Sequence, residues 1–411
     1  MNIADAFRMV VPDSPELEFV GYDGSRAGSP DAPYRITLTS ERALQAIAGA
    51  PGQLGIARAY VNGDVDISGD IYGAFDVLYR SAQMPSWSDR LALAKQFGPH
   101  ALKRLPPPPE EVRLSGRRHG KNRDAAAISH HYDVSNRFYE WLLGPTMAYT
   151  CAVFPKPDST LEEAQDEKFD LVCRKLGLQS GMRLLDVGCG WGGMARHAAA
   201  NYGVKVIAVT LSAQQATWGQ QMIREEGLTD LVDLRCGDYR DVPETGFDVV
   251  SSIGLTEHIG RANYPGYFSF LRDKLVEGGR LLNHCITRTD TKQPTMYRRG
   301  FINRYIFPDG ELVNVGHLIE AMEHQKLEVQ HEENLRVHYA MTLQKWSENL
   351  DDHWEDAVAE VGLRKARVWR LYLAVSRFGF AHNVIQLHQV LSTRTSPDGY
   401  ANIPLRPDWG S

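Results

Sequence analysis

The clearest candidate for a functional site is a glycine-rich turn that follows a short apolar segment containing Asp186. Gly188, Gly190 and Gly192 form this turn. Glycines between a strand and a helix allow the backbone to approach a ligand and leave amide groups pointing at it. A dinucleotide site would need G-x-G-x-x-G and an acidic residue about 20 positions later. The spacing here is different and the next apolar segment ends in Thr210, so the turn predicts a cofactor site of another kind.

A second candidate is Glu257, which follows the apolar segment FDVVSSIG at residues 247–254. Residues that face a ligand gather at the carboxyl ends of the strands in open α/β sheets. A carboxylate at such a place can act as a base. An isolated glutamate there can equally be a solvated or capping residue, so the position alone leaves both interpretations open.

Alternating strands and helices are expected to position these residues. Apolar strands are predicted at 183–188, 205–211, 232–238, 247–254 and 280–286. Helical stretches separate them at 193–203, 212–227 and 264–279. This alternation is typical of a parallel, doubly wound sheet in an α/β protein. The C-terminal third, 317–392, is richer in helices and aromatic residues and is expected to add a lid or pocket wall and a final strand.

The N-terminal part, residues 1–100, is predicted to be a small α+β domain. It contains a strand at 36–40, a helix at 40–50 capped by Ser40, and an amphipathic stretch beginning at Ile71. Residues 101–125 form a proline-rich basic linker, because four consecutive prolines, 106–109, cannot continue a helix. The catalytic domain is expected to span residues 126–411.

The linker region carries the conspicuous basic cluster of the chain. Its members are Lys103, Arg104, Arg113, Arg117, Arg118, Lys121 and Arg123. A solvated linker and a contact with anionic lipid headgroups are both compatible with this cluster.

Bulk composition excludes several classes of protein. The formal net charge is −6, which disfavours a nucleic-acid binder that depends on overall charge. The five cysteines are widely spaced, so no disulfide framework or metal site is suggested, and reduced cytoplasmic thiols fit best. The first residues lack the apolar region of a secretory signal, and no apolar run approaches about 18 residues.

Many motifs occur in one order along the chain. They are 131–136 (HYDVSN), 149–152 (YTCA), 161–165 (LEEAQ), 185–193 (LDVGCGWGG), 210–215 (TLSAQQ), 237–242 (GDYRDV), 257–260 (EHIG), 301–310 (FINRYIFPDG) and 385–390 (IQLHQV). Together they resemble the cyclopropane-fatty-acid synthase family over roughly residues 125–392. The first 100 residues resemble, with weaker motifs, the lipid-presenting domain of the long bacterial members.

The resemblance implies a class I methyltransferase fold, a Rossmann-like doubly wound sheet, with S-adenosyl-L-methionine as cofactor. The glycine turn would hold the methionine part, Thr210 to Gln215 would lie near the ribose, and Asp238 with Tyr239 would frame the adenine. The implied cofactor-binding residues are Tyr149, Thr150, Asp186, Gly188, Gly190, Trp191, Thr210, Leu211, Gln215, Asp238 and Tyr239.

The same resemblance implies a bicarbonate ion as the base. Its binding groups would match Cys151, Glu257, His284, the backbone amide of Ile286, and Tyr339. A cysteine proposed as catalytic in many members is replaced here by Ser376, so a thiol nucleophile is not available at that position. Aromatic residues are candidates for the wall of an acyl channel. They are Tyr305, Phe307, Trp346, Tyr372, Phe378 and Phe380.

The implied activity is transfer of a one-carbon unit to the cis double bond of an unsaturated phospholipid acyl chain. The product would be a cyclopropane or a methylene- or methyl-branched chain, a choice that the sequence leaves open. Such an enzyme is expected in the cytoplasm, in transient peripheral contact with the inner membrane surface, and a homodimer is among its open oligomeric states. The alternatives are a class I methyltransferase acting on a polar small molecule or nucleic acid, and a non-catalytic lipid-binding protein that retains the fold.

Overall fold

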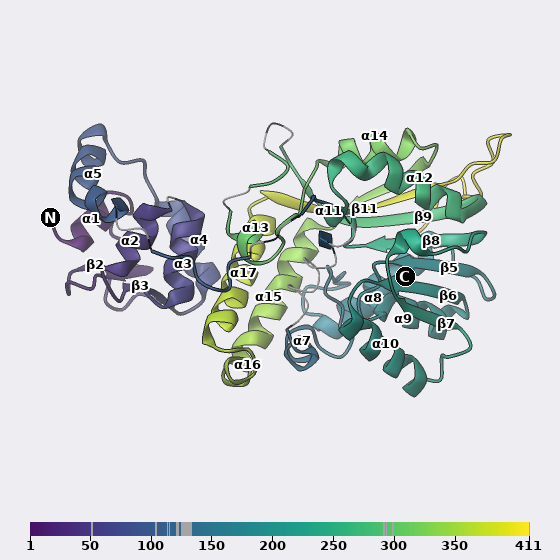
Figure 1. The fold of residues 1–411 in the computed structure, drawn as a ribbon, viewed down its shortest axis with the longest axis horizontal. Helices are drawn as coiled ribbons and strands as arrows, with labels where there is room; N and C mark the ends of the chain where they lie inside the picture. The colour runs from purple at the N-terminus through teal and green to yellow at the C-terminus, as the bar shows by residue number, and fades with distance from the viewer. Residues whose placement is uncertain are drawn as a thin grey trace. The chain divides into compact units, whose positions relative to one another are not determined.

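The computed structural model describes residues 1–50, 52–102, 105–112, 114, 116–120, 123–124, 134–290, 292, 294–297 and 300–410, without the side chains of 97–102. The chain divides into two compact units (Figure 1). Unit 1 comprises residues 1–113, 298–308 and 353–378, and unit 2 comprises 114–297, 309–352 and 379–411.

Unit 2 is built on a seven-stranded sheet in the order β10-β11-β9-β8-β5-β6-β7. Its strands are β5 (Arg183–Val187), β6 (Lys205–Thr210), β7 (Val232–Cys236), β8 (Phe247–Ile253), β9 (Leu275–Arg288), β10 (Glu328–Asn334) and β11 (Ile385–Thr393). The five strands from β5 to β9 pair in parallel, whereas β11 runs antiparallel to both β9 and β10. The parallel, doubly wound sheet predicted from the sequence is confirmed for these five strands, and the antiparallel β10 and β11 make the whole sheet mixed.

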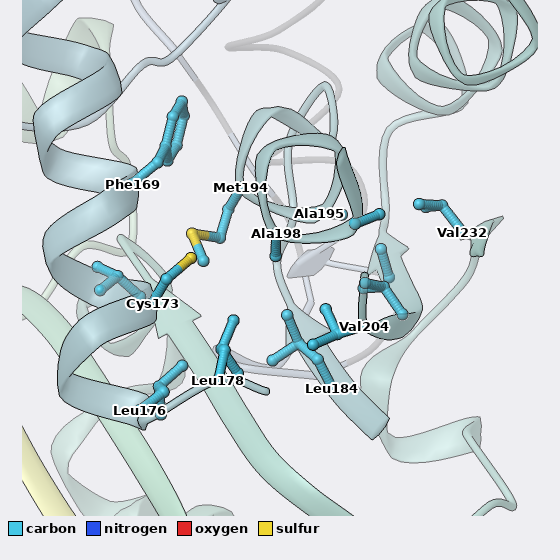
Figure 2. Packing of buried hydrophobic residues seen from close by; sticks show 14 of the residues in the cluster. Phe169, Cys173, Leu176, Leu178, Leu184, Met194, Ala195, Ala198, Val204 and Val232 are labelled. Atoms are coloured by element: carbon cyan, nitrogen blue, oxygen red, sulfur yellow. The ribbon is translucent and has the colours of Figure 1, made fainter. Parts of the chain in front are cut away.

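Helices cover both faces of this sheet (Figure 1). The helices and 3₁₀ turns of unit 2 are α7 (Asn136–Leu143), α8 (Leu161–Leu176), α9 (Gly193–Tyr202), α10 (Ala213–Glu225), η1 (Tyr239–Asp241), α11 (Thr256–Ile259), η2 (Arg261–Asn263), α12 (Tyr264–Lys274), α14 (Val315–Glu323) and α15 (Arg336–Asp352). One core cluster joins α8, α9 and α10 to one face, and a second joins α12 and α14 to the other. Figure 2 shows part of the first cluster, where Phe169 and Cys173 of α8 and Met194 of α9 lie above Leu184 of β5.

The start of α8 is fixed by local chemistry. The Thr160 side chain accepts a hydrogen bond from the backbone N–H of Glu163, and the Glu163 carboxylate accepts one from the Thr160 N–H. This capping box satisfies two N–H groups that a helix terminus leaves without a partner. Gly177 ends the helix in the left-handed conformation, with φ 65°. The position of α8 matters because it contributes two buried lysines that are described below.

Unit 1 contains a four-stranded sheet in the order β2-β1-β3-β4. Its strands are β1 (Leu17–Val20), β2 (Arg26–Gly28), β3 (Tyr34–Leu38) and β4 (Val65–Ser68). Its helices are α1 (Ile3–Arg8), α2 (Arg42–Gly49), α3 (Gln53–Asn62), α4 (Ile71–Ser81), α5 (Trp87–Leu102), α13 (Phe301–Tyr305), α16 (Trp354–Val361) and α17 (Leu363–Ala381), the last as far as residue 378.

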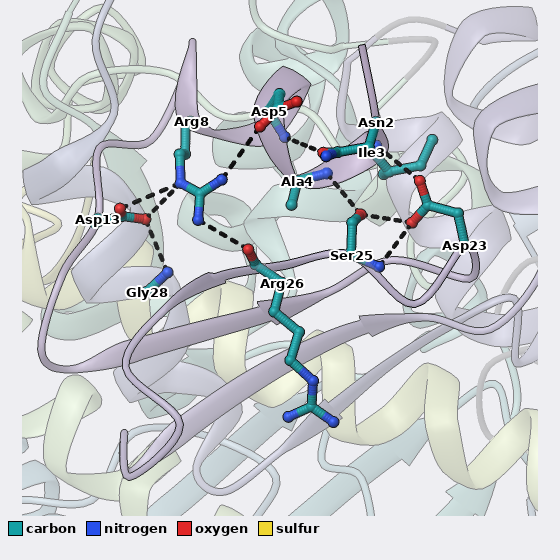
Figure 3. A network of polar contacts seen from close by, with 10 residues as sticks. All are labelled: Asn2, Ile3, Ala4, Asp5, Arg8, Asp13, Asp23, Ser25, Arg26 and Gly28. Carbon is teal, nitrogen blue, oxygen red and sulfur yellow. Dashed lines mark hydrogen bonds and ion pairs between the residues drawn. The ribbon is translucent and has the colours of Figure 1, made fainter.

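A polar network fastens α1 to the turn between β1 and β2 (Figure 3). The backbone N–H of Ile3 donates to Asp23 at 3.1 Å, and that of Ala4 donates to the Ser25 hydroxyl at 3.0 Å. Asn2 accepts from the next N–H of the helix. The first N–H groups of a helix have no acceptor within it, so these contacts supply what the short helix lacks.

The units divide the chain differently from the expected boundaries of 1–100, 101–125 and 126–411. Residues 353–378 join unit 1 because Arg367 of α17 donates to the carbonyl oxygens of Tyr60 and Val65 and to the carboxylate of Asp66. The proline segment also belongs to unit 1, and the N–H of Val112 donates to the carbonyl of Arg304 at 2.7 Å. Within the cluster of basic residues, Lys103, Arg104, Arg113 and Lys121 lie outside the described residues.

Two helices near the start of the chain can be compared with the sequence prediction, and one of them differs from it. Ser40 does not cap α2, because the helix begins at Arg42 and Glu41 occupies the N-cap position; the Ser40 hydroxyl donates to Asp64. The amphipathic helix from Ile71 is confirmed as α4, and Asp70 caps it. None of the described helices is both long and apolar enough to cross a membrane.

Candidate functional site

The glycine turn lies at the carboxyl end of β5, as the sequence predicted. Gly188, Gly190 and Gly192 have φ values of 74°, 57° and 80°, in the left-handed region that favours glycine. The N–H groups of Gly188 and Cys189 both donate to the carbonyl of Val209 at 2.9 Å, which fastens the turn to β6. A Cβ atom at residue 188 would lie 3.2 Å from the Leu255 side chain, so the site leaves little room for one.

A pocket with about 560 Å³ of empty space opens beside this turn. It is lined by Met147, Ala148, Tyr149, Thr150, Lys168, Phe169, Asp186, Gly188, Cys189, Gly190, Trp191, Gly193, Met194, Gln215, Ile253 and Gly254. Segments that are far apart in sequence thus meet around one cavity.

Most of the cofactor-binding residues named from the sequence lie around this pocket. Those that line it are Tyr149, Thr150, Asp186, Gly188, Gly190, Trp191 and Gln215. Thr210 lies behind Gln215 and donates its hydroxyl to the Gln215 side chain at 2.7 Å. Leu211, Asp238 and Tyr239 are not among the residues that line the pocket.

Asp186 is the acidic group of the pocket. It is buried, and one carboxylate oxygen accepts a hydrogen bond from the Ser251 hydroxyl at 2.6 Å. Burial raises the pKa of Asp186 to about 6, against the lowering effects of Ser251 and Lys168. Within the described part of the chain, the second carboxylate oxygen has no hydrogen-bond donor. A buried acceptor of this kind is suited to a ligand that brings a donor.

Lys168 is a pocket residue that the sequence analysis missed. Its ammonium group donates to the Thr150 hydroxyl at 3.0 Å and lies 3.7 Å from the centre of the Phe169 ring. Burial lowers its pKa to about 7. The signal was weak because a lysine within an amphipathic helix is usually solvated. Gln165, one turn earlier, donates to the carbonyls of Ala148 and Thr150, so α8 holds the loop that lines the pocket.

Trp191 connects the glycine turn to α7. Its indole N–H donates to the Asn136 side chain at 3.0 Å, and its ring lies 4.8 Å from the ring of Tyr139. Asn136 is the last residue of the 131–136 motif, of which residues 131–133 lie outside the described residues. The described end of that motif therefore supports the pocket wall.

Asp238 and Tyr239 follow β7 at a separate position on the same edge of the sheet. The Asp238 carboxylate caps η1 and accepts a hydrogen bond from the Arg240 side chain. Tyr239 packs edge-on against the rings of Tyr267 and Phe270. Their predicted role beside the adenine stays a prediction.

Glu257 lies in α11, just beyond the end of β8. One carboxylate oxygen accepts the backbone N–H of Ile286 at 2.6 Å, at a point where β9 continues beyond the end of β8. Burial raises the pKa of Glu257 to about 7, although the Ile286 N–H opposes this shift. The other oxygen is buried, and no described residue donates to it. The structure thus joins two of the predicted catalytic groups in one contact.

His284 lies on β9 beside the pocket-lining end of β8. Its backbone pairs with Ile253, and its carbonyl accepts the N–H of Gly254 at 2.8 Å. The ring is buried, and Nδ1 lies 3.2 Å from the Gln389 side-chain nitrogen. Burial lowers the pKa of His284 well below its usual value, and the charges of Lys168 and Lys175 lower it further. Among the described residues nothing bonds to Nε2.

Cys151 and Tyr339 meet around the start of α15. The thiol of Cys151 is fully buried and lies 3.8 Å from the carbonyl of Leu335, which also accepts the N–H of Tyr339. Burial raises the pKa of the Cys151 thiol well above its usual value, so the thiol stays protonated. The Tyr339 ring stacks on Phe380 at 4.4 Å and meets Trp346 edge-on. These two candidates therefore share one neighbourhood.

The aromatic residues considered for an acyl channel divide between the units. Trp346 and Phe380 lie in unit 2 beside Tyr339, whereas Tyr305, Phe307, Tyr372 and Phe378 belong to unit 1. Phe307 packs edge-on against Tyr372, and Phe378 against Tyr79. Tyr305 packs against Phe301, also in unit 1, so each of these four rings has an aromatic neighbour in its own unit, and their role in an acyl channel stays a prediction.

Comparison with known proteins identifies the family. A model described as mycolic acid cyclopropane synthetase matches residues 119–390, which is more than half of the chain. The chain belongs to this cyclopropane synthase family. A probable fatty acid methyltransferase of Mycobacterium tuberculosis (strain ATCC 25618 / H37Rv) is 53% identical over 405 residues, covering 96% of this chain and 94% of that protein. The cyclopropane-fatty-acyl-phospholipid synthase of Escherichia coli (strain K12) is 36% identical over 315 residues, covering 75% and 78%.

Solved structures agree with the fold. Mycolic acid cyclopropane synthase CmaA1, complexed with SAH and CTAB, matches with a TM-score of 0.62 and 33% identity, over 65% of this chain and 97% of that chain. The predicted family and the class I methyltransferase fold are confirmed. Family members use S-adenosylmethionine to methylate or cyclopropanate lipid acyl chains, so the chain is an S-adenosylmethionine-dependent methyltransferase of this family.

The pocket residues fit that cofactor. A glycine turn offers its backbone amides, and the buried Asp186 oxygen without a partner among described residues suits the positively charged amino group of a methionine moiety. Gln215 and Thr210 supply side-chain oxygens next to the pocket, where the sequence lacks the acid that usually binds a ribose. Geometry and family thus point to the same ligand.

Proposed function

We propose that this enzyme transfers a one-carbon unit from S-adenosylmethionine to the cis double bond of an unsaturated phospholipid acyl chain. The observation that carries the proposal is that Glu257 and His284 each keep a buried polar atom, and that the backbone of His284 pairs with Ile253 and Gly254, which line the pocket suited to the cofactor. Neither Glu257 Oε2 nor His284 Nε2 has a partner among the described residues. Buried polar groups are nearly always hydrogen-bonded, so these two atoms support a ligand site.

The chemistry requires such a site. The bound cofactor supplies an electrophilic methyl group, and an alkene carbon that accepts it leaves a carbocation on the neighbouring carbon of the chain. The site must exclude water, which would trap this cation, and must keep negative charge and a base close by. The burial of Cys151, Glu257 and His284 meets the first requirement. The rings of Tyr339 and Trp346 offer faces that attract a cation.

Bicarbonate is the base that we propose, held by Cys151, Glu257, His284, Ile286 and Tyr339. The ion carries both a donor and acceptors, so it can satisfy Glu257 Oε2 and His284 Nε2 together. The Ile286 amide already donates to Glu257 at 2.6 Å, so it would act on the ion through that carboxylate or by changing partner. The ion supplies the base that removes the proton, and no thiol nucleophile is then required at Ser376.

The product depends on whether a hydride moves before the proton leaves. Loss of a proton from the added methyl to the first carbocation closes a cyclopropane ring. If a hydride first shifts from the methylated carbon to the neighbouring cationic carbon, loss of a proton from the same methyl leaves a methylene branch, which a separate reductase can saturate to a methyl branch. The relatives reflect both outcomes, since one is named a fatty acid methyltransferase and another a cyclopropane synthase.

A phospholipid in a membrane is the substrate form that we propose, and it places the enzyme in the cytoplasm in transient contact with the inner membrane surface. The name of the Escherichia coli relative supports this form of substrate. Of the described basic residues in 101–125, the exposed Arg117 can contribute to that contact, since each Lys or Arg near an anionic surface adds about 1 kcal/mol, whereas Arg118 and Arg123 pair with Asp309.

The test is incubation of the full chain with methyl-labelled S-adenosylmethionine and vesicles of unsaturated phospholipid. NMR of the released acyl chains distinguishes a ring from a methylene branch, which are isomers of equal mass. Vesicles of saturated phospholipid are the control and should take up no label. Label confined to water-soluble material would favour a methyltransferase of polar substrates, and cofactor binding without any transfer would favour a lipid-binding protein.

A further inference from the structure

A chain of buried polar groups leads from His284 to the edge of the sheet. Nδ1 of His284 lies 3.2 Å from Nε2 of Gln389, its register partner on β11. Oε1 of Gln389 accepts a hydrogen bond from the Lys175 ammonium at 2.7 Å. Lys175 in turn pairs with Glu333 on β10. Four elements, β9, β11, α8 and β10, each contribute one member of this chain.

Burial of these polar side chains costs free energy, which a purely structural role would not require. Gln389 and the Lys175 side chain are fully buried, whereas the Glu333 carboxylate is 38% exposed. A buried lysine loses hydration energy, and a hydrophobic side chain of similar length would avoid that loss. The ion pair with Glu333 favours the charged form of Lys175, although burial lowers its pKa.

The chemistry of these groups fixes the direction of every hydrogen bond. An ammonium group donates and cannot accept, so the oxygen of the Gln389 amide must face Lys175. The NH₂ of Gln389 then faces His284, and Nδ1 must accept. A neutral imidazole with an accepting Nδ1 carries its proton on Nε2. The strong lowering of the His284 pKa agrees with a neutral ring at pH 7.

We propose that Lys175 and Gln389 are positioning residues that hold His284 as the tautomer protonated on Nε2. The buried Nε2 atom then faces the reacting site as a hydrogen-bond donor and not as a base. The inference rests on the proposed function in so far as an anion is to receive this hydrogen bond. In that function, the two roles then belong to different groups: His284 orients the anion, and another group removes the proton.

The direct test is nitrogen NMR of the full chain labelled with ¹⁵N-histidine. The His284 signals are identified by their loss in the His284→Asn variant. We expect a pyrrole-type shift for Nε2 and a pyridine-type shift for Nδ1 in the wild type at pH 7. The opposite assignment, or a charged ring, would overturn the inference. This measurement needs no turnover, so an enzyme without activity on lipids would refute the proposed function and leave the tautomer result standing.

Gln389→Glu reverses the polarity of the chain without changing its shape. Both carboxylate oxygens accept, so Nδ1 must donate and the proton leaves Nε2 in the neutral ring. We expect the NMR pattern to invert or to become that of a charged ring, and kcat to fall by about 10²-fold, as when one stabilising donor is removed. The KM for S-adenosylmethionine should change little, because the cofactor pocket does not include Gln389.

Gln386→Glu is the matched control on the same strand. Gln386 donates to Asn383 near the surface, so the same substitution should leave both the NMR pattern and kcat unchanged. Lys175→Met removes the group that orients the amide, and we expect the two neutral tautomers to coexist in a folded protein. A Gln389→Glu variant that keeps the wild-type pattern and rate, or a Lys175→Met variant that keeps a single Nε2–H tautomer, would refute the role of these residues.

Discussion

Replacing Glu257 by glutamine separates the charge of this side chain from its shape. The amide oxygen can still accept the N–H of Ile286, which Glu257 accepts at 2.6 Å. The other oxygen becomes an NH₂ group that can no longer carry negative charge toward a carbocation or accept a proton. Removal of one electrostatic stabiliser of this kind typically lowers kcat by about 10²–10³-fold. We expect that loss, measured by transfer of labelled methyl to unsaturated phospholipid.

The same substitution should stabilise the fold at high pH. The pKa of Glu257 is raised from 4.5 to about 7, so the unfolded chain releases this proton first. Stability therefore falls as the pH rises from about 4.5 to about 7 and is constant above that. Each pKa unit corresponds to about 1.4 kcal/mol, so the ionised carboxylate costs about 3 kcal/mol at pH 8. Glu257→Gln removes this cost, and the variant should unfold at a higher temperature than the wild type at pH 8 but not at pH 5.

Glu311→Gln is a control that should lower the stability at pH 8 instead of raising it. The nearby His119 ring, whose Nε2 lies 3.6 Å from the carboxylate, lowers the pKa of Glu311, and the carboxylate accepts the backbone N–H of Arg261. A carboxylate whose pKa is lowered by folding stabilises the protein at pH values above the pKa that it has in the unfolded chain. This variant should therefore be less stable than the wild type at pH 8. Thermal unfolding at both pH values checks the two variants together. A Glu257→Gln enzyme with nearly wild-type kcat, or one destabilised equally at pH 5 and pH 8, would refute the reasoning.

Three further predictions concern the pocket and unit 1. Asp186→Asn should weaken binding of S-adenosylhomocysteine by about 10–100-fold in calorimetry, because a charged acceptor is lost; equal affinity would exclude contact with the ligand. Gly188→Ala should lower the unfolding temperature more than Gly227→Ala, since both glycines have positive φ but only the former site has a neighbour within 4 Å of the new Cβ. Arg367→Met should destabilise by about 2 kcal/mol and expose unit 1 to proteolysis, because the Arg367 guanidinium donates to the carbonyls of Tyr60 and Val65. Arg364→Met should do neither, because the Arg364 side chain is exposed.

The parallel half of the sheet could be predicted because each strand carries its own signal. Buried strands are near-continuous apolar runs, such as RLLDV before the glycine turn, and amphipathic helices separate them. The strand β10 (Glu328–Asn334) was missed because an edge strand needs no apolar run, and four of its seven residues are charged or histidine. Its pairing with β11 depends on contacts about 60 residues apart in sequence, which no local pattern records.

The candidate site was predictable residue by residue but not as a set of contacts. Motif order gave Glu257 and Ile286, yet nothing in the sequence indicates that the carboxylate of one accepts the amide of the other. Lys168 and Lys175 were missed for the same physical reason. Both lie on α8, a helix whose residues appear amphipathic, and their burial follows from the sheet and loop that cover that face.

Three buried polar atoms of the site lower the stability of the protein without ligand. Asp186 Oδ2, Glu257 Oε2 and His284 Nε2 have no hydrogen-bond partner in the part of the chain that the structure describes. They belong to residues on or just beyond β5, β8 and β9, which are adjacent in the sheet. Each such atom costs about 1–3 kcal/mol when buried without a partner. The fold can tolerate this loss of stability at one edge of the sheet, because ligands that form hydrogen bonds with the three atoms restore the stability when they bind.

That reasoning predicts a linkage between ligand binding and stability. S-adenosylhomocysteine should raise the unfolding temperature of the wild type, by an amount that grows with the logarithm of its concentration. Bicarbonate added to the same sample should raise it further, and this second increment should vanish in Glu257→Gln while the first persists. An increment from bicarbonate that is equal in wild type and variant would mean that the ion acts elsewhere, and the anion site at Glu257 and His284 would have to be abandoned.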